Sequence, residues 1–514
     1  MHYGKYSMMI KNYPKPFLIG LAIIINLLIT YCLTSRYFPI EPDAANSPLV
    51  WRDFTSHGLS AFKDWVPTPD NWYFTTYPVN FVFFLITNSD VKLPLVMSTS
   101  FFVSGASILF AAAIYSVNKS FLASLLTLTS LAFLPAYIYT YGFAAHPFSH
   151  YSTNFFGALV FSLALLNLRK RSLHLTYLYS FIAILVSTSD PWFLATYFLP
   201  LLLTLFYLTY KNRALKKHSF VCLVAFIISV LHLPQKALNL PIQRFKLAPL
   251  DQWLTNAEWT YNILGKSLNL LIIDNTASHA ISLIVWISIF TYSLITCFGK
   301  GRRTDFVCLF SFLSIAGIIS SFIISYDAPA DISARFFVNA VCFFALMAAL
   351  RISFSVKAPI ILAFILFITT SSCSYYNNTT PLYDQENQTY DFMAFLKQNN
   401  LSFGYGDYWK FSNTVNWLSS GEIHITPVLF DTQTYRVDLK NHRSQTMKSW
   451  LDMDYIGKAP NRQFIIIPTI RNNEADIYHN PQLQAITGQF GNPDEILDYS
   501  GVTIFIYNHK IIEQ

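Results

Sequence analysis

The sequence predicts a mainly α-helical fold, a polytopic bundle of transmembrane helices followed by a small extracytoplasmic α/β domain. The chain of 514 residues is 53% hydrophobic and only 12% charged, with a mean hydropathy of +0.37, whereas soluble domains carry about 25% charged residues. Long apolar runs continue as far as residue 374, and residues 375–514 are polar. We therefore predict a transmembrane catalytic domain over 1–374, which includes a first external loop at 36–92, and a soluble domain over 375–514.

Eleven apolar runs approach the length of a transmembrane helix, which is about 20 residues. These runs are 17–35, 93–117, 120–143, 151–168, 174–189, 192–210, 219–234, 279–298, 305–325, 336–350 and 358–374. A further run, 77–88, is too short to cross and is expected to lie along the interface or to re-enter. The first run is expected to be retained, because RYFPIEPD after it is a poor signal-peptide cleavage site.

The basic residues predict the orientation of these spans. With the amino terminus in the cytoplasm, the short cytoplasmic segments hold 16 lysines and arginines, and the longer external segments before residue 375 hold nine. This is the positive-inside pattern. Of the 13 acidic residues before residue 375, only Asp305 falls on the cytoplasmic side. The amino terminus is therefore expected inside, and the acidic groups and the carboxyl-terminal domain outside.

The first external loop carries the densest group of candidate site residues. Between residues 36 and 78 it holds Glu41, Asp43, Asp53, Asp64 and Asp70, interleaved with Trp51, Trp65 and Trp72. A plain connector between spans does not need this composition, so the loop is predicted to contribute to a site. The emphasis falls on Glu41 and Asp43, which lie nearest the bilayer, and the other acids are interpreted as shape and solvation.

Other external segments add candidates of complementary chemistry. They are AAHPFSHYSTN with His146 and His150, the turn STSDPWF with Asp190, SYDAPADISARFF with Arg335, and the loop 235–278 with Arg244. The last loop mixes charges with apolar and tryptophan residues, which suits amphipathic segments on the bilayer surface.

Residues 375–514 alternate helix and strand signals and are long enough to bury a core of their own. Helices are expected at YDFMAFLKQ and DEILD, and strands at EIHITPVLF, RQFIIIPTI and GVTIFIYNH. The segment FGYGDYW at 403–409 suits either a turn at a domain edge or a contact with an acceptor glycan. The six cysteines lie in or beside apolar runs without a CxxC pair, so they are interpreted as small buried hydrophobes.

External carboxylates, histidines and arginines beside a membrane suit sugar transfer from a polyprenyl phosphate. Phosphate leaves readily, but a hydroxyl acceptor needs a base, for which Asp or Glu suffices. Arginine supplies a bidentate positive charge to the departing phosphate. The predicted base is Asp43, with Glu41 and Asp53 as competitors. The residues predicted to bind the donor phosphate are Arg335, Arg244 and His146. The predicted second carboxylate or acceptor contacts are Asp190, His150 and Trp72. Direct displacement implies inversion, and a divalent metal ion is left open as a cofactor.

Each assignment has a structural alternative. Asp43 suits a helix cap, and Asp190 before proline suits an N-cap with Pro at N1. Arg335 can extend to the interface along its apolar stem. The histidines can be ordinary loop residues, and the tryptophans can belong to an interfacial aromatic belt.

The whole layout resembles the GT-C superfamily of integral membrane glycosyltransferases, which have a first span, a long acidic external loop, further spans and often a soluble external domain. The resemblance implies a catalytic carboxylate early in the first loop, here at Glu41-Pro42-Asp43. The large external regions at both ends are also similar to the serotype-converting O-antigen glucosyltransferases of temperate phages. No WWDYG block of the oligosaccharyltransferase type is present.

The resemblance implies hexosyl or pentosyl transfer from a polyprenyl-phosphate sugar to a glycan or lipid acceptor, such as the O-antigen of lipopolysaccharide. It implies a bacterial inner membrane, with the active face toward the periplasm. A cell-envelope glycan ligase or polymerase stays open, and so does a secondary transporter, although transporters usually show internal repeats. Despite the net charge of +7, the basic residues sit in short loops between spans, which argues against nucleic-acid binding.

Overall fold

The computed structural model describes residues 15–431, 433–468 and 481–512. The chain divides into two compact units. The membrane unit runs as far as Phe38 and adds Pro69–Val79 and Leu95–Leu382; the sheet unit consists of Pro39–Thr68, Asn80–Pro94 and Tyr383–Gln514. Most of the first external loop therefore belongs to the same unit as the carboxyl-terminal domain, whereas the sequence analysis grouped it with the membrane domain.

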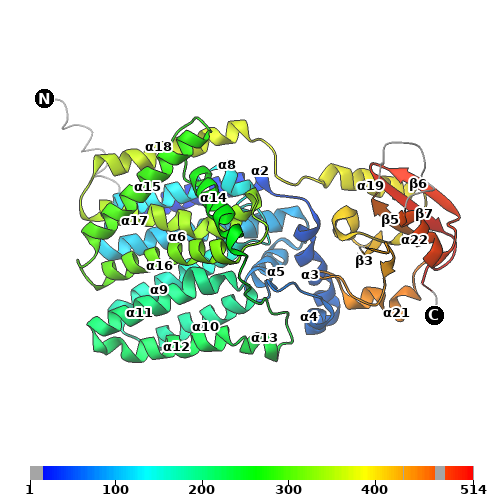
Figure 1. The fold of residues 1–514 in the computed structure, drawn as a ribbon, viewed down its shortest axis with the longest axis horizontal. Helices are drawn as coiled ribbons and strands as arrows, with labels where there is room; N and C mark the ends of the chain where they lie inside the picture. The colour runs from blue at the N-terminus through cyan, green and yellow to red at the C-terminus, as the bar shows by residue number, and fades with distance from the viewer. Residues whose placement is uncertain (1–14, 432, 469–480, 513–514) are drawn as a thin grey trace. The chain divides into compact units, whose positions relative to one another are not determined.

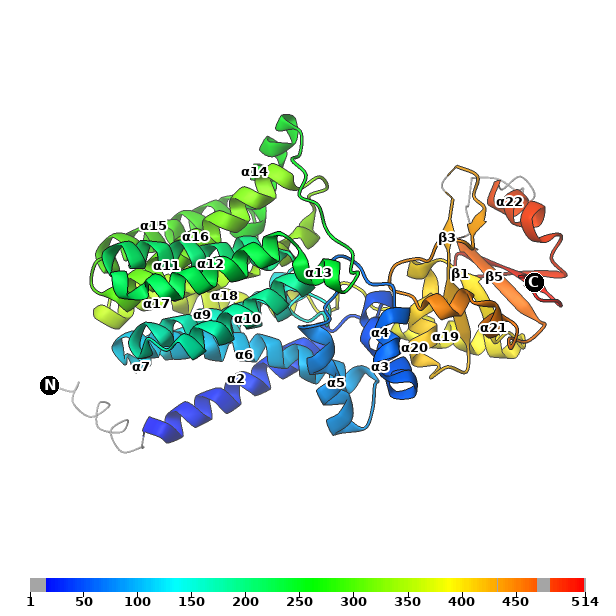
Figure 2. The same cartoon turned by 90° about the horizontal axis from the view of Figure 1, so that it is seen from below.

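The membrane unit is a bundle of long helices that lie side by side (Figures 1 and 2). Its elements are α2 (Lys15–Tyr37), α6 (Lys92–Asn118), α7 (Phe121–Ala132), α8 (Ala136–Thr140), α9 (His150–Lys170), α10 (Leu173–Ser189), η4 (Leu194–Phe198), α11 (Leu199–Lys211), η5 (Arg213–Leu215), α12 (Lys216–Val230), α13 (Leu233–Ala237), α14 (Leu250–Ser267), α15 (Thr276–Cys297), α16 (Arg302–Ser325), η6 (Asp331–Phe337), α17 (Val338–Phe354) and α18 (Ala358–Asn377). The predicted multi-span helical fold is confirmed.

Eight helices of the described chain are long and apolar enough to cross a membrane. All eight coincide with predicted spans. The other three predicted spans correspond to the shorter helices α7, α10 and α12, of 12, 17 and 15 residues. The run at 77–88 forms α5 (Thr76–Thr87), and its 12 residues make it too short to span, as predicted.

The span predicted over 120–143 is interrupted, and proline explains the interruption. α7 ends at Ala132, and the next helix, α8, begins after Pro135. Proline lacks the N–H that would continue the helical hydrogen bonds, and it disfavours helical geometry in the residue before it. The run is therefore apolar over its whole length, but it forms two helices instead of one continuous helix.

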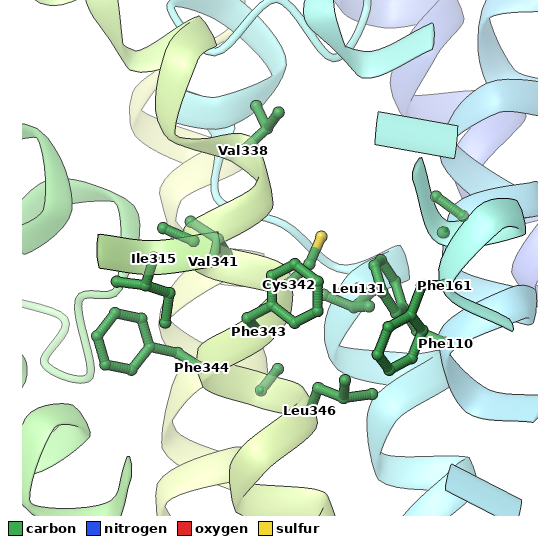
Figure 3. Packing of buried hydrophobic residues seen from close by; sticks show 14 of the residues in the cluster. Phe110, Leu131, Phe161, Ile315, Val338, Val341, Cys342, Phe343, Phe344 and Leu346 are labelled. Atoms are coloured by element: carbon green, nitrogen blue, oxygen red, sulfur yellow. The ribbon is translucent and has the colours of Figure 1, made fainter. Parts of the chain in front are cut away.

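The core of the membrane unit surrounds α17. Every residue from Val338 to Ile352 is buried, as expected for a helix that is hydrophobic on all faces and lies inside a bundle. Figure 3 shows the Phe343 ring among these side chains, and its centroid lies 5.4 Å from that of Phe110 and 5.6 Å from that of Phe310. This helix follows directly on η6, so a tightly packed core fixes the position of the residues that η6 carries.

The sheet unit contains a five-stranded sheet in the order β2-β1-β5-β7-β6. Its strands are β1 (Phe403–Gly406), β2 (His424–Pro427), β5 (Gln463–Pro468), β6 (Glu495–Tyr499) and β7 (Val502–Tyr507), and a separate antiparallel pair is β3 (Leu429–Phe430) with β4 (Val437–Asp438). β1 runs parallel to β2 and β5, and β7 runs antiparallel to β5 and β6. Apolar clusters include Phe392 of one helix and Ile486 of another, so the sheet has a core of its own.

The helices of this unit come from both ends of the chain. They are η2 (Pro42–Ala45), α3 (Asn46–His57), η3 (Gly58–Ser60), α4 (Ala61–Asp64), α19 (Glu386–Gln398), η7 (Tyr408–Ser412), α20 (Asn413–Leu418), η8 (Lys448–Leu451), α21 (Met453–Ile456) and α22 (Pro481–Phe490). Arg52 of α3 ties the two ends together: it pairs with Asp90 and donates to the carbonyl of Trp417 at 2.9 Å. Asp64 accepts from the backbone N–H of Ser449 at 2.9 Å, so Asp64 has a structural role.

The helix predicted at YDFMAFLKQ and the strands at EIHITPVLF and GVTIFIYNH are confirmed. RQFIIIPTI forms β5 as far as Pro468, and its last two residues lie outside the described chain. The helix predicted at DEILD is wrong, because this segment forms β6. Ser500 and Gly501 have φ of 41° and 84°, the left-handed geometry of a tight hairpin turn, and this turn folds the segment back onto β7.

Candidate functional site

Two groups of candidate residues assemble, one inside each unit. In the membrane unit the group is centred on Asp190, which lies in the turn after α10 and is 1% exposed. Its Oδ2 accepts from Nδ1 of His150 at 2.7 Å and from the hydroxyl of Thr153 at 2.7 Å. Its Oδ1 accepts from the backbone N–H of Trp192 at 3.0 Å. Oδ1 therefore caps the turn, the structural role considered above for Asp190, while Oδ2 binds the imidazole of His150.

Aromatic rings enclose His150 at the start of α9. The ring of Trp192 stacks on it with centroids 5.1 Å apart, and that of Phe336 lies at 4.8 Å. The Trp72 ring lies at 6.0 Å, and Trp72 has a φ of 61°. A bulky residue rarely adopts this left-handed backbone, and strained residues of this kind concentrate at functional sites.

Asp70 faces the same group. Burial raises the pKa of its carboxyl, and the nearby Asp190 carboxylate raises it further, while His150 and Arg335 act in the opposite direction. A carboxyl with this environment is a candidate proton acceptor, because a raised pKa brings it closer to the working pH. From the sequence, Asp70 was interpreted as shape and solvation only, and its neighbours in the structure make it a stronger candidate.

The guanidinium of Arg335 lies against two aromatic rings. Its guanidinium carbon lies 5.4 Å from the ring centroid of Phe143 and 5.1 Å from that of Phe336. Its Nε is buried and has no hydrogen-bond acceptor within the described part of the chain. An unsatisfied buried donor is costly, so this environment is suited to an anionic ligand. The His146 ring stacks on Phe143 at 4.9 Å, close to the same arginine.

The second group lies in the sheet unit, where the start of the first loop meets FGYGDYW. The Tyr408 hydroxyl donates to Asp43 Oδ1 and lies 3.4 Å from Asn46 Oδ1. Burial and the carboxylates of Asp43 and Glu41 hold the pKa of Tyr408 well above its usual value. The Arg443 guanidinium carbon lies 3.5 Å from the Tyr408 ring centroid. Two carboxylates, a phenol and an arginine are thus assembled within one unit.

The role of Asp43 as a helix cap, offered as its structural alternative, does not match this geometry. The residue at the N-cap of η2 is Glu41, and its side chain makes no capping hydrogen bond. Asp43 lies inside η2, and its carboxylate is turned to Tyr408. Glu41 is 3% exposed. Asp53, by contrast, pairs with His57 one turn further along α3, at 2.7 Å.

The structure therefore brings together some predicted residues and separates others. Asp190, His150 and Trp72 form one group, with Arg335 and His146 adjoining it through Phe336 and Phe143. Arg244 is exposed in the extended segment between α13 and α14, and its side chain makes no contact with this group within the described residues.

Thr153 and Arg443 were not predicted from the sequence, and Tyr408 was predicted only as part of the segment FGYGDYW. The helical spacing of Thr153 from His150 was the one available signal for Thr153.

Trp51 packs on Phe81, with ring centroids 5.0 Å apart, so its ring contributes to the apolar packing of the sheet unit. Across the described ranges, no group of three or more His, Cys, Asp or Glu side chains is arranged to hold a metal ion.

Among known proteins, this chain resembles solved structures in fold. No family model matches the sequence, and no curated protein sequence matches it. The solved structure of ArnT from Cupriavidus metallidurans bound to undecaprenyl phosphate matches with a TM-score of 0.52 at 9% identity, over 96% of this chain and 98% of that one. The chain shares the fold of this ArnT structure.

Two solved structures of an oligosaccharyltransferase from Archaeoglobus fulgidus also match. One is tethered with an acceptor peptide containing the NVT sequon, at a TM-score of 0.46 and 10% identity over 88% of this chain and 69% of that one. The other is a complex with Zn and sulfate, also at a TM-score of 0.46 and 10% identity. The fold shared with the ArnT structure agrees with the predicted multi-span helical unit, and the residue assignments rest on the geometry described above.

Proposed function

We propose that this protein is a membrane glycosyltransferase, which moves a sugar from a polyprenyl-phosphate donor to a hydroxyl group of a cell-envelope glycan or lipid. The observation that supports this most is the Arg335 cation, whose buried Nε has no acceptor in the described chain and which acts on the Asp70 carboxyl, itself close to Asp190. The fold shared with ArnT, a protein solved with undecaprenyl phosphate, supports a lipid-phosphate ligand for such a cation.

The chemistry follows from these groups. Arg335 donates to the phosphate oxygens and stabilises the negative charge that develops as the bond between the sugar C1 and the phosphate oxygen breaks. A carboxylate removes the proton of the acceptor hydroxyl while its oxygen forms the new bond to C1. Attack opposite the departing phosphate inverts the configuration at C1. The products are the glycosylated acceptor, a polyprenyl phosphate and one proton.

The identity of the base is proposed at two positions. Asp43 is the first choice, since it stands at the start of the first external loop and is held by the Tyr408 hydroxyl. Asp70 is its competitor, because burial and Asp190 raise its pKa. In the membrane unit, Asp190 orients His150 by a 2.7 Å hydrogen bond. His150 and Trp72 are proposed acceptor contacts, and His146 a second donor-phosphate contact.

The finer features of the activity are also proposals. The transferred sugar is a hexose or a pentose, and the acceptor is a glycan such as O-antigen. The site faces the periplasm of a bacterial inner membrane, since the basic loops gather at the opposite ends of the predicted spans, as cytoplasmic loops do.

The test is sugar transfer by purified variants in nanodiscs with a radiolabelled polyprenyl-phosphate hexose. Arg335→Met should reduce transfer by at least about 100-fold, the effect of removing one transition-state donor. Arg335→Lys should retain part of the activity, because it keeps a point charge but loses the bidentate fork. Arg244→Met serves as the matched control, since Arg244 is exposed and outside the group. Equal losses in Arg244→Met and Arg335→Met, or full activity in Arg335→Met, would contradict the assignment.

Asp43→Asn and Asp70→Asn, assayed in the same way, separate the two candidate bases. The variant that lacks the base should lose transfer while it still binds the donor lipid. Full activity in both variants would exclude both carboxylates as the base.

A further inference from the structure

A polar pocket lies in the membrane unit among α8, α14, η6 and α18. It encloses about 360 Å³, within the range of ligand pockets, about 300–1,000 Å³. The polar and aromatic side chains that line it include Tyr137, Tyr141, Lys266, Asp331, Asn377 and Asn378. Neither Arg335 nor Asp190 lines it, so it is separate from the group proposed to hold the donor phosphate.

The charges in this pocket disfavour a phosphate. Nζ of Lys266 lies 2.7 Å from Asp331 Oδ1, and the Tyr137 hydroxyl donates to the same oxygen at 3.0 Å. The single cation of the lining is therefore already neutralised. Asp274, which also lines the pocket, adds a second carboxylate, which is 80% exposed and pairs with His279 at 2.6 Å, so the lining carries two carboxylates and one cation. An anionic ligand would meet repulsion here, whereas a neutral ligand would not.

The remaining groups match the two faces of a sugar. The ring of Tyr141 lies 5.3 Å from that of Tyr137 and is partly exposed, which offers an apolar face to the C–H groups of a sugar ring. Asn377 is exposed and Asn378 half-buried, and both line the pocket. Amides both donate and accept, as sugar hydroxyls require.

We propose that this pocket is a saccharide subsite, which holds a neutral sugar of the acceptor glycan; this rests on the proposed function. Its link to the chemistry is η6, which begins with Asp331 in the pocket and carries Arg335 four residues later. Four residues of 3₁₀-helix rise about 8 Å. A sugar bound against Asp331 therefore contacts the same short helix that presents the donor-phosphate arginine.

The experiment is saturation-transfer NMR on the purified full chain in nanodiscs, without donor. The probes are the methyl glycosides of glucose, galactose, mannose, rhamnose and xylose, with glucose 1-phosphate as an anionic probe. At least one neutral glycoside should give saturation transfer, and Tyr141→Leu should weaken it at least fivefold. Tyr376→Leu is the matched control, because Tyr376 precedes Asn377 on α18, is 85% exposed and does not line the pocket.

Asn377→Leu is a second test, at the exposed last residue of α18, where a substitution should change folding stability little. The inference is overturned if no neutral glycoside gives a signal, if Tyr141→Leu and Asn377→Leu both match Tyr376→Leu, or if glucose 1-phosphate displaces the neutral sugars.

Turnover separates this inference from the proposed function. With a transferring enzyme, Tyr141→Leu should raise the KM for the acceptor and leave the KM for the donor unchanged. An unchanged acceptor KM would overturn the subsite alone, while a wild-type chain without any transfer from a polyprenyl phosphate would overturn the proposed function and leave the binding result standing.

Discussion

Replacing Asp190 by asparagine tests whether its carboxylate positions His150. Oδ2 accepts two hydrogen bonds of 2.7 Å, from His150 and Thr153, and Oδ1 accepts one from Trp192 N–H. An asparagine has one oxygen and one NH₂, so at least one of these donors would face another donor in a fully buried place. A hydrogen bond to a charged group contributes about 1.5–3 kcal/mol, which corresponds to a rate loss of about 10- to 150-fold.

The assay is a double-mutant cycle on the rate of sugar transfer, with Asp190→Asn, His150→Gln and the double variant. Because the two side chains act through one contact, the double variant should be about as slow as the slower single variant, which gives a coupling of about 1.5–3 kcal/mol. Asp305→Asn is the matched control, because its carboxylate is also buried and accepts from Gly299 N–H at 2.6 Å. Asp305 lies in the first turn of α16, whereas η6, which carries Arg335, follows the last turn of that helix. Additive losses from Asp190 and His150, or equal losses in Asp305→Asn, would show that Asp190 does not position His150.

Two further predictions concern pH. The pKa of Asp70 is raised by burial and by Asp190, so the Asp70 carboxyl lowers folding stability at a pH where it is ionised in the unfolded chain. Asp70→Asn should therefore raise the melting temperature at pH 7 but not at pH 4 or below. A lower melting temperature of the variant at pH 7 would contradict this prediction. Burial lowers the pKa of His424 to about 3, so the sheet unit should lose at most about 1.4 kcal/mol of stability per pH unit as the pH falls from about 6.5 toward 3. His424→Phe should reduce this loss in hydrogen-exchange measurements on β1 and β2, and an identical pH dependence in the variant would contradict the assignment.

Composition and apolar length were sufficient to predict the membrane fold, since both are properties of the linear sequence. The eight long helices coincide with predicted spans because each is a nearly continuous apolar run. Local breaks were harder to predict: Pro135 ends the helical geometry within one such run. In the sheet unit, the pattern of DEILD suits a helix by composition, and the turn at Ser500 and Gly501 decides for a strand.

The candidate site was predictable as a set of residue types at one face of the membrane, but not as a set of contacts. Asp190 and His150 are 40 residues apart and were predicted on the same face, which is a necessary condition for their hydrogen bond. The contact of Asp43 with Tyr408 joins positions 365 residues apart, and no periodicity in the sequence encodes it. Asp70 gained its candidacy only from its tertiary neighbours, Asp190, His150 and Arg335.

The most direct test of glycosyl transfer is the fate of the label when the purified protein is mixed with a polyprenyl-phosphate [¹⁴C]hexose and a cell-envelope glycan acceptor. We expect the wild-type chain to move the label from the lipid to the acceptor, and Arg335→Met to leave it on the lipid. Label that stays on the lipid with a folded wild-type chain, or sugar that crosses a vesicle membrane without becoming attached to an acceptor, would rule out glycosyl transfer as the function of this protein.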